Sequence, residues 1–122
     1  MELLKFLKQH DIKRFITTSS TRDILMLNIK NVGIKDYFTG LISGDDVSNN
    51  KPAPDIYLHA LDVTNASPEE AVIFEDSTSG IEAGLAANID VVIVPDLLQP
   101  SKEMAKQSVA VLPSLADAIA MF

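Results

Sequence analysis

Three short polar segments of the 122-residue chain carry the side chains that could bind or transfer a phosphate group. Thr17–Ser20 gathers four hydroxyl groups, and Lys51 lies between a polar loop and two prolines. Glu75 and Asp76 are adjacent acids at the end of an apolar run. Because ligands bind beyond the carboxyl ends of the strands in parallel α/β sheets, we expect these segments to meet in a functional site.

The hydroxyl segment precedes a stretch with helical spacing, so Thr18 and Ser19 are expected near a helix N-terminus. Free amide groups and the positive end of the helix dipole favour an anion at such a place, and the hydroxyls could help to hold a phosphate. The ordinary alternative is that Ser19 or Ser20 only caps the helix. Taken by itself, this segment favours the capping interpretation.

Lys51 opens the segment Lys51–Asp55, in which two prolines fix the approach to a helix. A lysine held by such a stiff segment can reach a phosphate as a point charge. Most lysines in loops are only solvated, but the rigid surroundings of this one favour a defined position. We therefore expect Lys51 to contribute positive charge to the site.

Glu75 and Asp76 lie where a buried strand is expected to meet water, and two carboxylates there would repel each other. A divalent cation relieves that repulsion, and Mg²⁺ prefers one or two carboxylates together with water and phosphate oxygens. The pair therefore indicates a magnesium site. An equally weighted alternative is that Asp76 or Ser77 caps the following helix while Glu75 is solvated.

Apolar runs and amphipathic stretches alternate along the chain, which predicts an α/β fold with a parallel sheet between helices on both faces. Strands are expected at Phe15–Ser19, Gly40–Ser43, Ala71–Asp76, Asp90–Val94 and Val109–Leu112. Helices are expected at Met1–Gln9, Thr21–Asn31, Asp55–Leu61, Ser77–Asn88, Ser101–Gln107 and Ser114–Met121.

The residues between these elements support the assignment. Ser67–Glu70 has a capping-box pattern, and Ser20 with Asp23 is a weaker example. Gly33 is placed where a C-cap glycine belongs. Small residues, Gly80 and Gly84 among them, lie near one face of the fourth helix, so we expect that face to pack closely on the sheet.

The composition narrows the class of protein. Seventeen acidic and ten basic residues give a net charge of −7 without a basic cluster, which argues against nucleic acid as a partner. The absence of cysteine excludes disulfides and thiolate chemistry. No apolar run reaches the roughly 18 residues of a membrane-spanning helix, so we expect no membrane segment and a cytoplasmic protein. Residues 1–122 should form one α/β domain, or part of one.

Together these motifs resemble, in order and spacing, the later motifs of the haloacid dehalogenase-like (HAD) hydrolase superfamily. The resemblance is to its beta-phosphoglucomutase and phosphoglycolate phosphatase-like branch, and it covers about Leu3 to Phe122. It is carried by Thr18-Ser19, by Ile42–Asp46 ahead of Lys51–Tyr57, and by Glu75–Ser77 followed by Gly80–Gly84.

This resemblance implies a three-layer, Rossmann-like core and Mg²⁺-dependent phosphoryl transfer on a small phosphorylated metabolite. Thr18, with the Ser19 backbone, would hold the phosphoryl group, and Lys51 would neutralise its charge. Glu75 and Asp76 would bind Mg²⁺ directly or through water. In the family an aspartate attacks the phosphoester, and water or a sugar hydroxyl then accepts the phosphoryl group.

One family feature has no counterpart here, because the sequence contains no Asp-x-Asp motif. In the family that motif supplies the nucleophile and ends a strand between those that end at Thr18 and at Glu75; a helical cap domain follows it. The resemblance thus implies an incomplete core, the C-terminal portion only. We expect two unpaired strand edges at a gap, closed by direct pairing, by a second copy in a homodimer, or by a complementing N-terminal segment.

Two functions remain open from the sequence. The chain is part of a phosphatase or phosphomutase that is inactive until the nucleophile segment is supplied, or it is a truncated, non-catalytic protein that serves as an interaction module or has no independent function. A phospho-acceptor receiver domain is rejected, because its acids should come first and its lysine last. Here the order is hydroxyl, lysine, acids.

Overall fold

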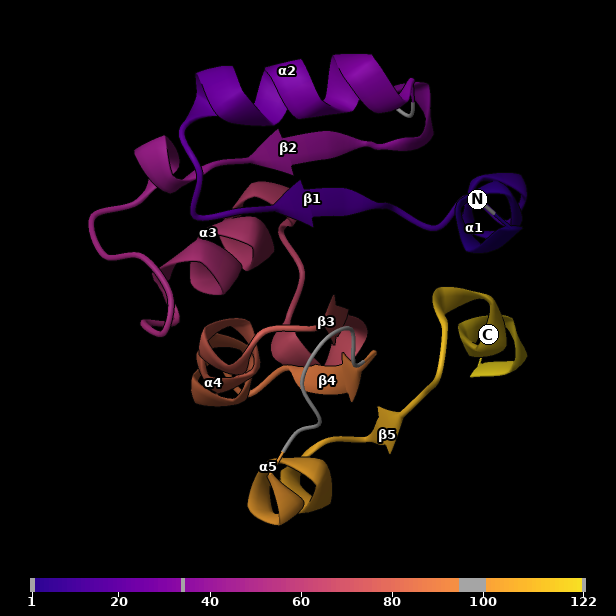
Figure 1. Ribbon diagram of the computed structural model, residues 1–122, viewed down its shortest axis with the longest axis vertical. Helices are drawn as coiled ribbons and strands as arrows, with labels where there is room; N and C mark the ends of the chain where they lie inside the picture. The colour runs from indigo at the N-terminus through magenta and orange to yellow at the C-terminus, as the bar shows by residue number, and fades with distance from the viewer. Residues whose placement is uncertain (1, 34, 95–100, 122) are drawn as a thin grey trace.

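Strands and helices alternate through the computed structural model, which describes residues 2–33, 35–94 and 101–121 (Figure 1). The strands are β1 (Phe15–Thr17), β2 (Gly40–Ile42), β3 (Val72–Glu75), β4 (Asp90–Ile93) and β5 (Ala110–Val111). The α-helices are α1 (Glu2–Gln9), α2 (Arg22–Val32), α3 (Asp55–Thr64), α4 (Thr78–Ala86) and α5 (Lys102–Gln107). Short 3₁₀ helices are η1 (Lys35–Tyr37), η2 (Gly44–Asp46), η3 (Pro68–Glu70) and η4 (Leu115–Met121).

The predicted α/β class with parallel strands is confirmed, since β1 pairs with β2, β3 with β4 and β4 with β5, all in parallel. The strands β1, β2 and β3 each end where a predicted apolar run gives way to polar residues. The expected sites of Thr18, at the end of β1, and of Glu75 and Asp76, at the end of β3, therefore lie at the carboxyl ends of parallel strands.

The cap of α2 lies one residue later than predicted. Thr21 has extended backbone angles, and its side chain accepts a hydrogen bond from the Ile24 N–H at 3.4 Å. The pairing of Ser20 with Asp23 is therefore wrong, because the Ser20 carbonyl instead accepts the Gly44 N–H at 2.8 Å. At the other end of α2, Gly33 is the predicted C-cap, in a left-handed conformation with φ of 73°.

The predicted capping box at Ser67–Glu70 and the predicted C-terminal helix both belong to 3₁₀ helices. Ser67 and Glu70 form the capping box, with the Ser67 N–H donating to Glu70 Oε1 at 3.0 Å, yet they open only η3. The chain must turn into β3 directly after this turn, which leaves no room for an α-helix. The C-terminal stretch predicted as a helix is the 3₁₀ helix η4; apolar residues spaced three apart suit either type.

The described strands form two separate sheets rather than one. The first has the order β1-β2 and the second β3-β4-β5, and in Figure 1 the free edges of β1 and β3 face each other. This is the arrangement expected for a core with a strand position open between those that end at Thr18 and Glu75. The exposure of the strands agrees: Val91 and Val92 of β4 are fully buried, whereas every residue of β1 is only half-buried.

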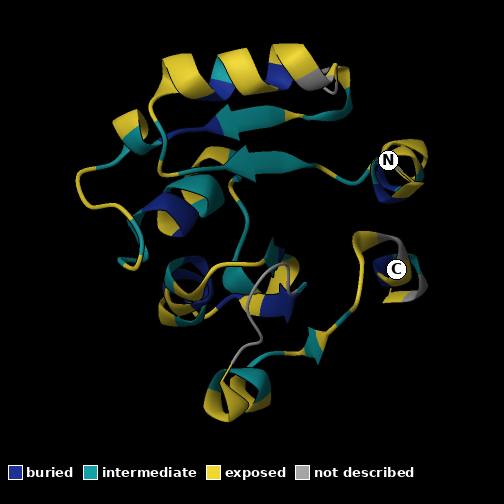
Figure 2. Cartoon of the chain, viewed as in Figure 1, coloured by how far each residue is buried: buried dark blue, intermediate teal, exposed yellow. Residues whose placement is uncertain are grey.

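One apolar cluster holds the two sheets together without strand pairing. It includes Ile42 from β2, Ile73 from β3 and Ile56 of α3, which is fully buried, and Phe15 of β1 packs against it. Helix α3 contacts both β1 and α4, and thus bridges the sheets on this face. Figure 2 shows the buried residues concentrated along α3, α4 and β4.

A second cluster covers the opposite face. Leu3 and Leu7 of α1 pack with Ala118 of η4, and Phe74 of β3 contacts them. Phe74 and its neighbour Ile73 belong to different clusters, as side chains that alternate along a strand must. Helices therefore lie on both faces, as predicted. In the part of the chain that the structure describes, no helix is long and apolar enough to span a bilayer.

The open edges give a test by amide hydrogen exchange. We expect the β4 amides to exchange most slowly, because β4 is paired on both sides, while alternate amides of β1 and β3 exchange fast at their unpaired edges. Exchange followed by NMR at several protein concentrations checks this. Uniform protection of β1 and β3 at all concentrations would contradict an open strand position, and protection that grows with concentration would indicate pairing between copies.

Candidate active site

The loop after β1 places the predicted phosphate-binding hydroxyls. Thr18 continues the ladder by donating its N–H to the Ile42 carbonyl at 3.0 Å, and its hydroxyl accepts the Ser20 N–H at 3.2 Å. Ser19 is exposed and does not cap α2, so the capping interpretation of Ser19 and Ser20 is wrong. Both Thr18 and Ser19 thus stand in the turn between β1 and the N-terminus of α2.

The neighbouring turn after β2 is locked against this loop. A Cβ atom on Gly44 would lie 2.3 Å from the Ser19 carbonyl oxygen, so only glycine lets the two loops touch. Asp46 accepts the Ser43 N–H at 2.8 Å and pairs with Arg22 at 2.9 Å. Those contacts lower the pKa of Asp46, the hydrogen bond from the Ser43 backbone most of all. This acid of the sequence motif is therefore part of a structural clamp.

Lys51 forms a buried ion pair with Glu75. Its Nζ lies 3.0 Å from Glu75 Oε2, and the two side chains are only 10% and 9% exposed. Lys51 comes from the loop before α3 and Glu75 from the end of β3, so the pair joins two of the predicted segments. The stiff proline segment and the pair together give the lysine a defined position, as the sequence indicated.

Both carboxylate oxygens of Glu75 accept further hydrogen bonds. The Tyr57 hydroxyl donates to Oε2 at 2.7 Å. Oε1 accepts the Asp76 N–H at 3.1 Å, the Ser77 N–H at 3.2 Å and the Ser77 hydroxyl at 3.0 Å. The interpretation of Glu75 as a solvated acid is thus wrong, because its charge is buried and its oxygens are bonded to protein donors.

Ser77 and Gly80 fix the other side of this carboxylate. The Ser77 side chain caps α4 by accepting the Gly80 N–H at 3.1 Å, which agrees with the capping alternative for this residue. A Cβ atom on Gly80 would lie 2.0 Å from the Glu75 carboxyl carbon. Gly84, one turn on, would meet Val91 at 2.7 Å, so it packs on the sheet as predicted. Gly80 instead makes room for a functional side chain.

The electrostatics of the pair follow from burial and charge. Burial by itself would raise the pKa of Glu75, but the charge of Lys51 and the hydrogen bonds from Tyr57, Lys51 and Ser77 outweigh it. The net effect lowers the pKa of Glu75 from 4.5 to about 2. Burial and the neighbouring Glu75 charge raise the pKa of Tyr57, so its hydroxyl stays protonated and can donate. Glu75 is therefore ionised at neutral pH.

Tyr57 is the site residue that sequence reasoning missed. It lies on the buried face of α3, is 4% exposed, and belongs to the apolar cluster, so its spacing looked like that of an ordinary core residue. The available signal was its hydroxyl, because a tyrosine at a fully buried position needs a polar partner. Tyr57 follows Lys51 by six positions in the sequence, and this spacing across a loop and a helix does not predict a contact.

The residues fit a magnesium ion only in part. In the described part of the chain no three His, Cys, Asp or Glu side chains gather closely enough to hold a metal. The Glu75 side chain is buried among protein donors, and the Asp76 residue is exposed to solvent at the carboxyl end of β3. Asp76 is thus the better candidate ligand, and water, phosphate oxygens or another segment must complete an octahedral shell.

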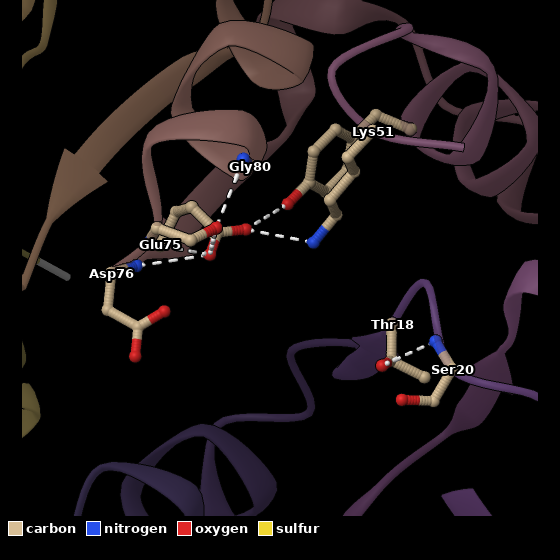
Figure 3. A network of polar contacts seen from close by, with 8 residues as sticks. Thr18, Ser20, Lys51, Glu75, Asp76 and Gly80 are labelled. Atoms are coloured by element: carbon tan, nitrogen blue, oxygen red, sulfur yellow. Dashed lines mark hydrogen bonds and ion pairs between the residues drawn. The ribbon is translucent and has the colours of Figure 1, made fainter. Parts of the chain in front are cut away.

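The predicted residues lie around one space at the carboxyl ends of the strands. Figure 3 shows the Lys51 ammonium and the Asp76 carboxylate directed toward the space that Thr18 faces from the other sheet. A hydroxyl, a fixed ammonium and a carboxylate at two helix N-termini can bind a phosphate and a cation, but they offer no activated nucleophile.

Comparison with known proteins identifies the fold family. Residues 1–94 match the family model of haloacid dehalogenase-like hydrolases. This chain belongs to the haloacid dehalogenase-like hydrolase family. The resemblance inferred from the motifs is thereby confirmed, and these hydrolases have the Rossmann-like core that the resemblance implied.

Individual HAD relatives agree with this assignment. The chain is 39% identical over 89 residues to a phosphorylated carbohydrates phosphatase of Thermotoga maritima. The matched region covers 73% of this chain and 41% of that protein. A beta-phosphoglucomutase-like protein of the same organism superimposes with a TM-score of 0.85 at 34% identity, covering 97% of this chain and 55% of that one. CbbY of Rhodobacter sphaeroides in complex with phosphate superimposes with a TM-score of 0.85 at 28% identity. The superposition covers 96% of this chain and 53% of CbbY.

The chain therefore spans about half the length of the solved HAD relatives and about two fifths of the curated phosphatase. The portion shared with them contains the hydroxyl, lysine and acid segments. Activity and substrate belong to the whole of each relative.

The close approach of Gly80 to Glu75 predicts that Gly80→Ala destabilises the chain by roughly 1–3 kcal/mol, because the new methyl group must displace the carboxylate. Helix propensity alone would favour alanine by about 1 kcal/mol, so the sign of the change is diagnostic. Urea unfolding measures it, with the exposed Glu82→Ala on the same helix as control. A more stable Gly80→Ala variant would contradict the packing of Glu75 on α4.

The lowered pKa of Glu75 predicts an acid-sensitive contribution to stability. The folded-state pKa is about 2 and the ordinary value is 4.5, so the stabilisation is complete above pH 4.5 and is lost as pH falls toward 2. Urea unfolding between pH 7 and pH 2.5 should show a shallower decline for Glu75→Gln than for the unchanged chain. Equal slopes would mean that Glu75 has the same pKa in the folded and unfolded chain.

Proposed function

We propose that this chain is the phosphate- and cation-binding portion of a Mg²⁺-dependent phosphatase or phosphomutase, active on a small phosphorylated metabolite once a nucleophile strand is supplied. The observation that carries the proposal is the buried Lys51–Glu75 pair at the carboxyl ends of the strands, across from Thr18. Membership of the HAD family supports it, and so does the activity named for the Thermotoga phosphatase, which concerns phosphorylated carbohydrates.

Each residue has a role that follows from its position. The Thr18 hydroxyl and the backbone at Ser19, beside the N-terminus of α2, hold the phosphoryl oxygens. Lys51 neutralises charge on the phosphoryl group, and Glu75 keeps the ammonium in place. Asp76 is the carboxylate that would hold Mg²⁺, with Glu75 acting through water at most. A bound Mg²⁺ would supply positive charge to the phosphate oxygens.

The reaction needs an attacking carboxylate, whereas the two acids that the described residues place at this site, Glu75 and Asp76, are assigned to Lys51 and to the cation. A carboxylate oxygen attacks phosphorus in line, the bond from phosphorus to the substrate oxygen breaks, and that oxygen takes a proton as the alcohol leaves. Attack by water then breaks the acyl-phosphate bond, which releases phosphate and restores the carboxylate. In a mutase a second sugar hydroxyl takes the place of water. Lys51 and Thr18 act on the phosphoryl oxygens in both steps.

The open position between β1 and β3 is where that carboxylate should enter. Each of these edges belongs to a parallel sheet, and one added strand could pair with β1 on one side and β3 on the other. An acid at its carboxyl end would arrive beside Lys51 and Asp76, while its apolar residues would cover the half-buried Phe15 and Phe74. A complementing N-terminal segment of HAD type has these properties, and we favour it over a homodimer.

The second candidate is a non-catalytic, truncated HAD protein that acts as an interaction module. The saturation of Glu75 by protein donors favours it, since that carboxylate has no oxygen left for direct metal ligation. On this view the site keeps only weak phosphate binding, and the open strand edges mediate association with another chain.

Complementation distinguishes the two functions. The N-terminal part of the Thermotoga phosphatase, carrying its nucleophile strand and cap, is purified and mixed with this chain and an aryl phosphate in the presence of Mg²⁺. We expect no turnover by either part alone and Mg²⁺-dependent turnover by the mixture, because attack requires a positioned nucleophile. Release of the phenol is followed by absorbance.

Three variants of this chain sharpen the result. Lys51→Met and Asp76→Asn should each lower turnover by about a hundredfold or more, whereas Glu82→Ala, at an exposed position of α4, should not change it. Association without turnover would favour the interaction module. Turnover by this chain alone, abolished by Asp76→Asn, would show that no added strand is needed.

A further inference from the structure

Tyr57 contacts both members of the ion pair. Its hydroxyl donates to Glu75 Oε2 at 2.7 Å, and the same oxygen accepts Lys51 Nζ at 3.0 Å. The Lys51 ammonium also lies 5.2 Å from the centre of the Tyr57 ring, within the range of a cation–π interaction. One side chain of α3 therefore binds the acceptor of the pair through its hydroxyl and the donor through its ring.

Packing alone does not account for a tyrosine at this position. Phenylalanine would fill the same space in the apolar cluster and would bury no hydroxyl. A buried hydroxyl is costly unless it is hydrogen-bonded, and here it is bonded to the carboxylate that holds Lys51. The hydroxyl is thus linked to the ion pair rather than to the core.

We propose that Tyr57 is a positioning residue that keeps Lys51 available to a phosphate by sharing the Glu75 carboxylate with it. This inference rests on the proposed function, in which Lys51 binds the phosphoryl group. With the hydroxyl in place, Oε2 has a second donor, so the ammonium can turn part of its hydrogen bonding toward an incoming anion. Without the Tyr57 hydroxyl, Lys51 is the remaining donor to Oε2, so Glu75 holds the ammonium more tightly.

The two contacts of Tyr57 can be removed separately. Tyr57→Phe keeps the ring beside Lys51 and loses only the hydroxyl, so it should weaken phosphate binding about tenfold, the equivalent of one charge-assisted hydrogen bond. Tyr57→Leu also loses the ring and should weaken binding further. A merely structural tyrosine would give the reverse pattern: Tyr57→Phe would be silent, and only Tyr57→Leu would have an effect, through stability.

The chain offers a spectroscopic signal for the hydroxyl. It contains two tyrosines and no tryptophan, so Tyr37→Phe leaves Tyr57 as the sole source of tyrosine emission. A hydrogen bond to a carboxylate quenches tyrosine emission and shifts its near-ultraviolet absorption. We expect both properties to change when phosphate draws Lys51 away from Glu75, and a Lys51→Met variant should lose that response.

The experiment titrates the whole chain with inorganic phosphate in the presence of Mg²⁺. Affinity is measured by calorimetry for the unchanged chain, for Tyr57→Phe and Tyr57→Leu, and for the matched control Tyr37→Phe. Circular dichroism and urea unfolding establish that each variant is folded. The emission titration in the Tyr37→Phe background needs no substitution at Tyr57, so it tests the contact even if the Tyr57 variants fold poorly.

The outcomes separate this inference from the proposed function. An affinity loss of about tenfold in folded Tyr57→Phe, with a phosphate-dependent emission change, supports the positioning role. Unchanged affinity in Tyr57→Phe together with a large loss in Lys51→Met overturns it and leaves the proposed function standing. Phosphate binding that is absent, or that Lys51→Met does not affect, overturns the proposed function and this inference with it.

Discussion

The buried carboxylate of Glu75 is the interaction on which the site depends. A negative charge inside a protein is tolerated only if it is paired and hydrogen-bonded, and this one draws its donors from three directions. Lys51 comes from the loop before α3, Tyr57 from α3 itself and Ser77 from the start of α4. Satisfying one acid therefore fixes the positions of a loop and two helices relative to the end of β3. Gly80 completes the arrangement by leaving room for the side chain.

Helix α3 also holds together the two sheets, whose described strands do not pair across the boundary between them. Apolar packing is non-directional, so Ile56 and its neighbours can join the sheets but cannot set their spacing as a ladder of hydrogen bonds would. The exposure of the strands differs between the two sheets. The core is dense around β4 and open along β1, where a strand buried on both faces would ordinarily be expected.

Local sequence determines much of this structure, and the misses have physical causes. Apolar runs ending in polar residues placed Thr18 and Asp76 at the carboxyl ends of strands. The spacing of small residues predicted that the helix face containing Gly80 packs closely on the sheet. The cap of α2 moved to Thr21 because the Ser20 carbonyl bonds to Gly44, a contact between distant loops. The burial and ion pairing of Glu75 were equally hidden, because Lys51 lies 24 positions away in sequence and Tyr57 resembled a core residue. Local patterns locate elements, whereas long-range pairing decides which polar groups are occupied.

The charge of the site explains why a cation matters for phosphate. The chain carries a net charge of −7, and Lys51 is paired with Glu75, so the pair as a whole brings no net positive charge to a dianion. Asp76 adds a negative charge at the same place. Partial charges at the N-termini of α2 and α4 favour an anion, but each amounts to about half an elementary charge. A divalent ion at Asp76 would reverse the sign of the local charge. The phosphate affinity of this site should therefore depend more on the metal than on any one of its side chains.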